Sequence, residues 1–541
     1  MKKSSFVEGT FLSTFAIFLV KILGMLYVIP FYAMVGIKGA ALYAYAYNIY
    51  VIFLDISIVG LPIAISKIIS EYETLEQYEA KERAYKLGLR IVTIVTLICF
   101  TLLFVFAPNI GQLILGDLQG GNTIEDVALV IRVVSLSLLI VPFLSVTKGY
   151  LQGHKIISVP STSQVIEQVI RIGIILIGVF LSVYVWNLEL PFTISIALSG
   201  AFIGALVAYI YIYIKIRKDK TLKPKSTKKD AITNKEITKK IFSYSIPFII
   251  INTVFSIYNF VDMVFIMRTL EFLKFKASDI EFITSSITTW SGKISMIVAT
   301  IAMGMTVSLI PIIVEAFTKK DFKEVNFKLN QALQIIVFIS LPMTIGISML
   351  STAIWNIFYG LENNMGPTIL SIAIFVTLFG NLFMISSSTL QSLNKFKLVY
   401  KATFLGLLLN MLLDIPSILL FNQFGLAHIG ASVASIIGYS SSFLYILYKL
   451  NKEHDLNYKN TSNLLKDILI PIILMIAVVL ISKELIPVNY DSKISTIIYT
   501  GIVSLLGGST YILYTIKTKV LQRTIGEKNY NKIMKKLHLK K

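Results

Sequence analysis

The stretch FLVKILGMLYVIPF, residues 18–31, is a long apolar run that contains a single charged residue, Lys21. Such a run forms part of a helix that crosses a bilayer, and a lysine near the centre of that helix costs at least about 2.5 kcal/mol. About a dozen spanning residues lie on each side of Lys21, too many for its ammonium group to reach the lipid headgroups easily. A ligand or a partner must therefore offset the cost of this charge.

The composition of the whole chain extends this pattern. The 541 residues are 55% hydrophobic and only 15% charged, with a mean hydropathy of +0.75, which is too apolar for a soluble protein. The apolar runs are long and continuous, whereas a β-barrel needs short alternating segments. We predict an all-α polytopic membrane protein with about 14 transmembrane helices, since a span needs roughly 20 apolar residues. The expected spans cover residues 8–35, 41–68, 88–116, 126–150, 159–185, 191–215, 242–269, 282–317, 328–358, 366–392, 399–421, 427–449, 464–485 and 494–517.

The first of these runs is too long for a cleaved signal peptide and lacks a small-residue cleavage site. We therefore expect it to be retained as a span.

Basic residues alternate between the connections. The odd connections GDLQGGNTIED, WNLELP and GLENNMGP contain no lysine or arginine, whereas the connection between the sixth and seventh spans reads KIRKDKTLKPKSTKKDAITNKEITKK. The positive-inside rule then places both termini in the cytoplasm, in agreement with an even number of spans. The same alternation accounts for the formal net charge of +20 without a nucleic-acid partner.

Two internal matches indicate a duplication. YLQGHK at 150–155 corresponds to TLQSLNK at 389–395, with an offset of 239 between their glutamines. A glycine and a glutamate eleven residues apart recur in the second and eighth spans with an offset of 244, as Gly60 with Glu71 and Gly304 with Glu315. Structural repeats around a central site are common in transporters.

The duplication predicts two pseudo-symmetric six-helix lobes followed by two C-terminal helices. The expected domains are an N-terminal lobe at 1–217, a basic cytoplasmic linker at 218–241, a C-terminal lobe at 242–450, two further helices at 451–518 and a basic cytoplasmic tail at 519–541.

Two longer stretches resemble a known family. KGYLQGHKIISVPSTSQVIEQVIRI at 148–172 and GLPIAISKIISEY at 60–72, together with the plan of fourteen spans, resemble the YtgP/SpoVB branch of the MurJ-type lipid flippases. These belong to the multidrug/oligosaccharidyl-lipid/polysaccharide exporter superfamily, and the resemblance covers essentially the whole chain. It implies a flippase of the bacterial cytoplasmic membrane that carries an undecaprenyl-pyrophosphate-linked sugar precursor.

Lys21 and Lys293 are the candidate substrate-binding residues. Two ammonium groups from opposite lobes that line a water-filled cavity would suit a pyrophosphate. The resemblance implies basic residues in the first and eighth spans that face such a cavity, and Lys21 precedes the matching Ile-Leu-Gly turn. Gram-negative relatives carry an arginine and an aspartate where this chain has Tyr27 and Val28, so a gate built on those charges is not expected here.

A second candidate site is acidic. Asn410 and Asp414 are four residues apart, on one face of the eleventh span, and Asp262 lies within the seventh. Hard oxygen ligands in a low-dielectric bundle suit a small cation, but protonated or hydrogen-bonded carboxyls that hold helices together are the other reading. The resemblance implies a sodium ion bound by these three residues, with the hydroxyl of Ser435 and the carbonyl of Ala431.

The remaining charges receive ordinary structural roles. Glu167 and Arg171 are an i, i+4 pair that we expect to neutralise each other within the fifth span. Lys67, Glu71 and Glu315 lie at cytoplasmic helix ends, where solvated charge is common.

The sequence carries no sign of an enzyme. It has no glycine-rich nucleotide loop and no His/Cys metal cluster, and its single cysteine, Cys99, lies within the third span, so no disulfide can form within one chain. We therefore expect no catalysis, no direct use of ATP and no cofactor other than the sodium ion.

The leading hypothesis is a flippase that moves lipid II from the inner to the outer leaflet by alternating access. A flippase for a teichoic, capsular or spore-related glycan, a multidrug/cation antiporter, and a membrane scaffold that recruits cell-wall enzymes are the alternatives. The expected partners are the undecaprenyl-linked lipid and the membrane lipids. Cell-wall synthesis proteins are further candidate partners, and we expect a monomer.

Overall fold

The computed structural model describes residues 6–58, 60–219 and 232–536 of the chain. These ranges are almost entirely helical and contain no strand, which confirms the predicted all-α class. The contacts divide the chain into two compact units, Met1–Thr289 and Trp290–Lys541. Residues 220–231, which form most of the basic linker, lie outside the described ranges, as do Lys2, Lys3 and residues 537–541 of the tail.

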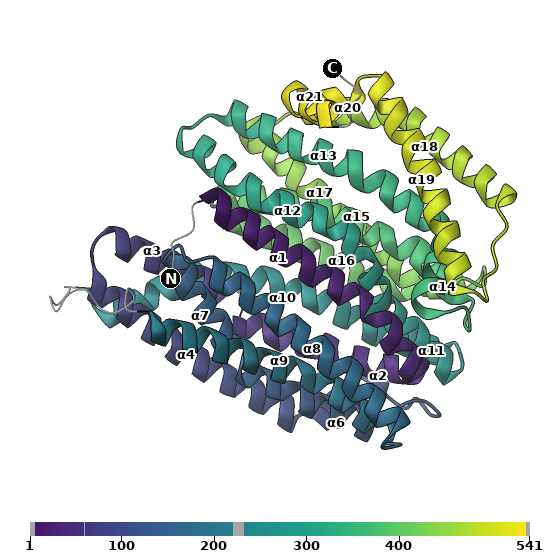
Figure 1. The fold of residues 1–541 in the computed structure, drawn as a ribbon, viewed down its shortest axis with the longest axis horizontal. Helices are drawn as coiled ribbons and strands as arrows, with labels where there is room; N and C mark the ends of the chain where they lie inside the picture. The colour runs from purple at the N-terminus through teal and green to yellow at the C-terminus, as the bar shows by residue number, and fades with distance from the viewer. Residues whose placement is uncertain (1–5, 59, 220–231, 537–541) are drawn as a thin grey trace. The chain divides into compact units, whose positions relative to one another are not determined.

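The first unit contains eleven described α-helices, labelled in Figure 1. They are α1 (Phe6–Leu26), α2 (Val28–Ile58), α3 (Gly60–Thr74), α4 (Tyr78–Val105), α5 (Ala107–Leu115), α6 (Ile124–Ser135), α7 (Val141–Gly153), α8 (Ser158–Tyr184), α9 (Leu190–Lys218), α10 (Asn234–Phe272) and α11 (Ala277–Ser285).

The second unit follows a π-helical turn, Ser286–Trp290. Its described helices are α12 (Ser291–Thr318), α13 (Phe322–Met349), α14 (Ser351–Tyr359), α15 (Met365–Ser392), α16 (Phe396–Asn422), α17 (Gly430–His454), α18 (Lys459–Leu485), α19 (Lys493–Lys517), α20 (Val520–Ile525) and α21 (Glu527–Lys536).

Twelve helical segments of the described chain are long and apolar enough to cross a membrane. Eleven of them correspond one to one with predicted spans, and the differences concern the first, second and eighth. A continuous segment, Val28–Thr74, contains the end of the first expected span and all of the second. Gly36, with φ of +64°, breaks the helical path inside α2, a conformation that costs glycine little because it lacks Cβ. The eighth expected span is α11, the π-helical turn and α12 in succession.

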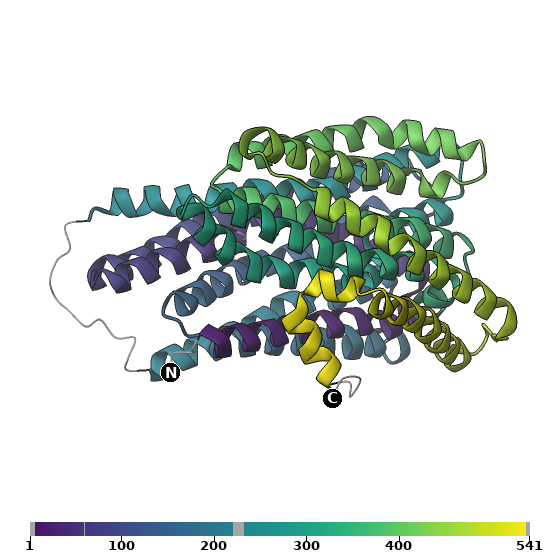
Figure 2. The same cartoon turned by 90° about the horizontal axis from the view of Figure 1, so that it is seen from above.

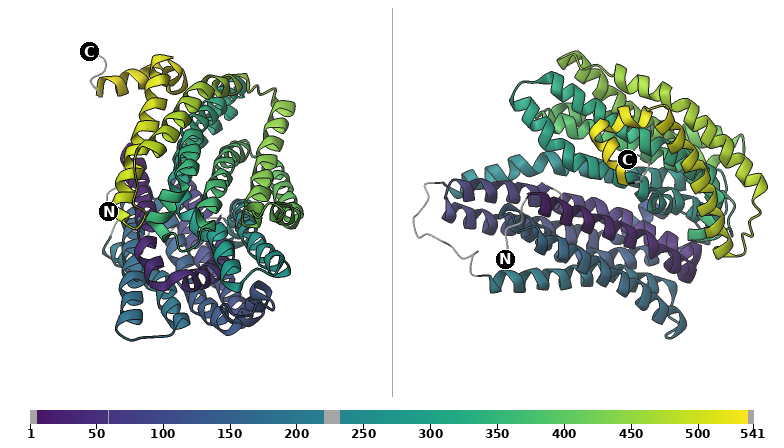
Figure 3. Two further views of the ribbon diagram at one scale, coloured as in Figure 1. Left: turned by 90° about the vertical axis from the view of Figure 1, so that its right-hand side faces the viewer. Right: turned by 45° about the horizontal axis from the view of Figure 1, so that its top comes forward.

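Close backbone contacts hold the first unit together. Its purple and blue helices run roughly parallel in the right-hand view of Figure 3, with α8 against α1 and α9, and α3 against α7 and α10. A Cβ built on Gly204 would lie 2.6 Å from the carbonyl oxygen of Glu167, and one on Gly200 would lie 2.9 Å from that of Arg171. These two glycines, four apart on α9, therefore let α9 approach the backbone of α8, as small residues do in membrane helix pairs.

The duplicated motifs end in the same local structure. After the first match the backbone N–H of Ile156 donates to the carbonyl of Leu151, and after the second that of Lys395 donates to Leu390. In each case the residue just before the donor has a positive φ, 61° at Lys155 and 56° at Asn394. Such a six-residue hydrogen bond closed by a left-handed residue is a common C-terminal cap.

The matched glycines and glutamates in α3 and α12 precede the same kind of cap, at Glu76 and Lys320. The sequence repeat is thus also a repeat of helix ends.

In the second unit, α16 and α17 form a closely packed pair, and α12, α13 and α17 surround α15. The green pair α16 and α17 lies side by side in Figure 2. The two C-terminal helices α18 and α19 pack on each other and contact α13 and α14, so they belong to this unit.

The boundary between the units falls after Thr289 rather than in the basic linker. The reason is that α10 packs on α2, α3 and α4, and α11 packs on α2, in this structure. The division into lobes at 1–217 and 242–450 stays a prediction about the moving parts.

We expect Gly204→Ala to lower the free energy of unfolding by about 1–3 kcal/mol, because the added methyl group must push α9 away from the backbone of α8. Thermal unfolding in detergent measures the effect. Gly173→Ala is the matched control, since a Cβ there meets no atom within 4 Å. Equal stability of the two variants would contradict the proposed close contact.

Candidate functional site

Lys21 lies on α1, half-buried, where α1 packs on α8. Gly24, one helical turn further along α1, would place a Cβ 3.3 Å from the side-chain nitrogen of Gln168 on α8. Residues three apart share a helix face, so Lys21 belongs to the face of α1 that meets α8.

Lys293 is the third residue of α12, directly after the π-helical turn, and is also half-buried. Lys21 belongs to the first unit and Lys293 to the second. The convergence of the two ammonium groups on one pyrophosphate stays a prediction.

The second unit brings three of the predicted sodium ligands together. Asn410 and Asp414 are fully buried on α16, and the Asn410 side-chain amide donates to Asp414 Oδ1 at 3.3 Å and to Ser435 Oγ at 3.1 Å. Ala431 is buried one turn before Ser435 on α17. Gly430 of α17 allows α17 to approach α16 closely, because a Cβ on it would lie 2.5 Å from the Cα of Ile418. An amide, a carboxylate and a hydroxyl thus gather at one buried place.

Asp262, the other predicted ligand, is buried on α10 in the first unit. The same unit holds an intramembrane carboxylate that the sequence analysis did not single out, Asp55 on α2, whose carboxylate accepts a hydrogen bond from Ser256 on α10. A lone aspartate in an apolar run was signal enough to find it.

The expected Glu167–Arg171 pair is wrong. Glu167 is paired instead with Lys148 of α7, with 2.8 Å between Nζ and Oε2. No carboxylate of the described chain pairs with Arg171, and its guanidinium lies over the ring of Tyr47, 5.8 Å from the centroid. The i, i+4 rule identified two neighbours on one face, but α7 supplies a closer partner that only tertiary packing could bring there.

The position of Arg171 near the middle of a membrane-spanning helix has a free-energy cost. It is the central residue of α8, thirteen residues from either end, or about 20 Å at the usual rise per residue. An arginine at a helix centre costs at least about 2.5 kcal/mol, and a cation–π contact returns about 0.5–2 kcal/mol. Much of the cost is therefore not met by the contact with Tyr47.

The connections on the predicted extracytoplasmic side meet at Glu281. This carboxylate, on α11, accepts hydrogen bonds from the backbone N–H of Asn122 at 2.6 Å and from its side-chain amide at 2.8 Å. The amide of Asn122 also donates to the carbonyl of Lys38 at 3.1 Å. Glu281 is buried, so its carboxylate depends on these donors for hydrogen bonding.

Two further groups of hydrogen bonds join α2 to the π-helical turn and α10 to α5. The side chain of Asn48 on α2 donates to the hydroxyls of Thr288 at 3.3 Å and Thr289 at 3.0 Å. Arg268 at the end of α10 donates to the carbonyls of Gln112 and Leu113 at the end of α5, both at 3.1 Å. In this structure α10 and α11 are therefore joined to the rest of the first unit at the ends that are predicted to be extracytoplasmic.

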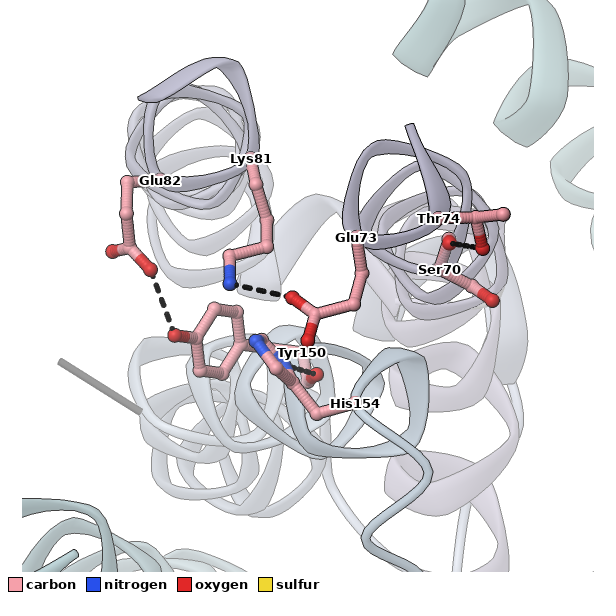
Figure 4. A network of polar contacts seen from close by, with 7 residues as sticks. All are labelled: Ser70, Glu73, Thr74, Lys81, Glu82, Tyr150 and His154. Carbon is pink, nitrogen blue, oxygen red and sulfur yellow. Dashed lines mark hydrogen bonds and ion pairs between the residues drawn. The ribbon is translucent and has the colours of Figure 1, made fainter. Parts of the chain in front are cut away.

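A polar network at the predicted cytoplasmic side explains the YLQGHK motif (Figure 4). Lys81 of α4 is buried and donates to Glu73 of α3 at 2.8 Å, while the hydroxyl of Tyr150 on α7 donates to Glu82 of α4 at 3.0 Å. The ring of His154 lies 2.9 Å, Nδ1 to O, from the carbonyl of Tyr150. In Figure 4 these side chains point toward one another from three helices, so the network joins the ends of α3, α4 and α7, and the motif contributes the contact between α7 and α4.

Comparisons with known proteins agree with this fold. The family model "Polysaccharide biosynthesis protein" matches residues 6–317, and the MatE model matches residues 284–415. The chain is 31% identical over 536 residues to the Lipid II flippase MurJ of Bacillus subtilis (strain 168), and this match covers 97% of each chain. The chain belongs to the MurJ-type family.

Other relatives of this MurJ-type chain are more distant. Stage V sporulation protein B of the same organism is 24% identical over 340 residues, or 62% of this chain and 63% of that protein. A solved structure of the Lipid II flippase MurJ in an inward closed conformation has a TM-score of 0.63 at 20% identity and covers 94% of this chain and all of the other. A solved structure of an inward-facing MATE family transporter has the same TM-score at 15% identity, and the match covers 80% of this chain and 94% of the other. At these identities the structures show the shared fold.

Membership of the MurJ-type family makes the chain a multi-pass membrane protein of a transporter family. Its sequence-predicted residues fall into one cluster on α16 and α17, one lysine in each unit, and Asp262 in the first. Arg171, Asp55 and Glu281 are the charges that the sequence analysis missed or assigned to a wrong partner.

We expect Glu281→Ala to destabilise this MurJ-type protein by about 1–3 kcal/mol, because two donors of the buried Asn122 lose their acceptor. The free energy of unfolding in detergent tests this, with Glu362→Ala as the control because Glu362 is exposed in a loop. If both variants unfold like the parent chain, the carboxylate does not fasten this end of the unit.

Proposed function

We propose that this chain translocates lipid II, the undecaprenyl-pyrophosphate-linked peptidoglycan precursor, from the inner to the outer leaflet by alternating access. The observation that carries the proposal is the 31% identity to the Bacillus subtilis Lipid II flippase MurJ over 97% of both chains. This match covers nearly the whole of both chains, whereas a shared fold alone is compatible with many substrates.

The proposed chemistry is recognition without covalent change. Lys21 and Lys293 are compact, strongly hydrated cations that suit a pyrophosphate. The polyprenyl tail stays in the lipid while the sugar-peptide headgroup crosses through a wet cavity, since burying an unpaired polar headgroup in hydrocarbon is costly. The membrane potential acts on any net charge that moves, by about 2.3 kcal/mol per elementary charge per 100 mV. We propose a monomer in the bacterial cytoplasmic membrane with both termini in the cytoplasm.

A flippase for another polyprenyl-linked glycan is the second candidate. The match of residues 6–317 to the "Polysaccharide biosynthesis protein" model favours it. The MATE-type alternative has less support, because the MatE model matches only residues 284–415 and the MATE structures are 15% identical.

The proposal predicts that this chain restores outer-leaflet lipid II accessibility in a strain depleted of its own lipid II flippase. Lys21→Ala and Lys293→Ala should each lower the restored signal by about tenfold or more, because each removes a charge from the pyrophosphate site. Lys401→Ala, which removes an exposed lysine at the start of α16, should leave the signal unchanged. Failure of the parent chain to restore accessibility would contradict the lipid II assignment.

We further propose that sodium binds at Asn410, Asp414, Ser435 and the Ala431 carbonyl, with Asp262 as the ligand from α10. The clustering of an amide, a carboxylate and a hydroxyl at one buried place fits a hard cation, which takes oxygen ligands. Sodium would supply a positive charge that offsets the buried carboxylate of Asp414.

This sodium proposal predicts a higher melting temperature in sodium chloride than in choline chloride at equal ionic strength. Sodium at 100 times its dissociation constant would stabilise the folded state by about 2.7 kcal/mol. Asp414→Asn should abolish the difference, and Asp455→Asn, at an exposed residue after α17, should retain it. A parent chain with the same melting temperature in both salts would rule out the site.

A further inference from the structure

A polar cavity lies inside the first unit. Its volume is about 220 Å³, and its walls come from α1, α2, α7, α8 and α9. The polar side chains that line it include Lys148 of α7 and four residues of α8, namely Gln164, Glu167, Gln168 and Arg171.

The four α8 residues form one stripe. Their spacing, at positions i, i+3, i+4 and i+7, places them on one helix face. The stripe begins seven residues before Arg171, toward the end of α8 that the charge pattern assigns to the cytoplasm, and ends at Arg171 at the middle of the helix. Gly200 and Gly204 of α9 pack against the backbone of α8 at Arg171 and Glu167, which fixes the position of the stripe.

The charges around the cavity are not balanced. Lys148 and Glu167 neutralise each other at 2.8 Å. Arg171 has no carboxylate partner in the described chain, and neither Gln164 nor Gln168 makes a hydrogen bond there. A cation with two amides therefore faces the cavity, and such a set of donors is suited to an anion.

Lys21 lies on α1, which borders this cavity. Val20, its neighbour, lines the cavity, and the α1 face that carries Lys21 meets Gln168.

We propose that Arg171 binds the phosphate end of the lipid-linked substrate, in a cavity that the first unit forms by itself. This inference rests on the proposed flippase function, whose pyrophosphate site it extends. A planar guanidinium binds two phosphate oxygens at once, which an ammonium cannot do. Pockets for drug-sized ligands measure roughly 300–1,000 Å³, and this cavity is smaller, so in this proposal it holds the diphosphate and not the sugar-peptide headgroup.

The pair of Lys148 and Glu167 has a positioning role in this proposal. Glu167 is one turn from Arg171, so without Lys148 its carboxylate would turn to the guanidinium and compete with the phosphate. The ion pair thus keeps Arg171 available to a ligand.

Binding to the full chain in phosphatidylcholine nanodiscs tests the proposal, with undecaprenyl diphosphate as the probe. We expect Arg171→Gln to weaken binding by about tenfold or more, and Arg171→Lys to weaken it less, since the charge remains. The matched control is Arg217→Gln, because Arg217 lies over the ring of Tyr213 at 4.8 Å but is exposed at the end of α9. Binding by Arg171→Gln that equals the parent would overturn the proposal.

A double substitution separates binding from mere damage to the fold. Lys148→Gln should weaken binding, and Lys148→Gln with Glu167→Gln should restore it, because the competing carboxylate is gone. A structural role for the ion pair alone predicts that the double variant is as weak as the single one, and that outcome would overturn the positioning role.

Competition identifies the source of the anion. Inorganic pyrophosphate should displace the lipid probe from the parent chain, since the two share the diphosphate group. Equal displacement by nanodiscs that contain phosphatidylglycerol would overturn the assignment to a diphosphate.

The flippase-depleted strain distinguishes the two proposals. If the parent chain fails to restore accessibility but still binds the probe through Arg171, the proposed function fails and the anion site stands. If the parent chain restores accessibility and Arg171→Gln both binds and restores like the parent, the anion site fails and the proposed function stands.

Discussion

A charge inside hydrocarbon must be paired, hydrogen-bonded or hydrated, and this constraint decides which helices of the chain lie together. Lys148 meets Glu167 across α7 and α8, and Asp55 meets Ser256 across α2 and α10. Each pair joins segments that are apolar over most of their length. Because lipid tails are as apolar as leucine, such polar contacts and close packing, rather than burial of apolar surface, specify partners within a membrane.

Small residues allow close helix packing beside these polar contacts. Gly200 and Gly204 bring α9 against the backbone of α8, and the glycine at 430 brings α17 against α16. In each case the close approach lies beside a polar cluster, the α8 stripe in one unit and the Asn410 cluster in the other. A shift of either helix would therefore move the side chains of the proposed sites as well as change the packing.

The fastenings of the first unit are compatible with a transport cycle. At the ends predicted to be extracytoplasmic, hydrogen bonds at Asn48, Asn122 and Arg268 help to hold α10 and α11. Each such bond contributes about 0.5–1.5 kcal/mol net, and those to charged groups somewhat more. Ties of this size hold one conformation without preventing another, whereas a large apolar interface would resist opening.

The sequence by itself determined the all-α membrane class, the approximate spans, the repeat and the family, because these depend on run length, period and matching residues along the chain. It also placed Asn410 and Asp414 on one helix face, since they are four residues apart. The partners of Glu167 and Arg171 were decided only by tertiary structure. Their spacing of four residues predicted that they pair with each other. In the structure Lys148 of α7 pairs with the carboxylate of Glu167, and Tyr47 of α2 contacts the guanidinium of Arg171. A charged side chain in a membrane pairs with the partner that is nearest in space. The spacing of residues along one helix does not determine the distances to side chains on other helices.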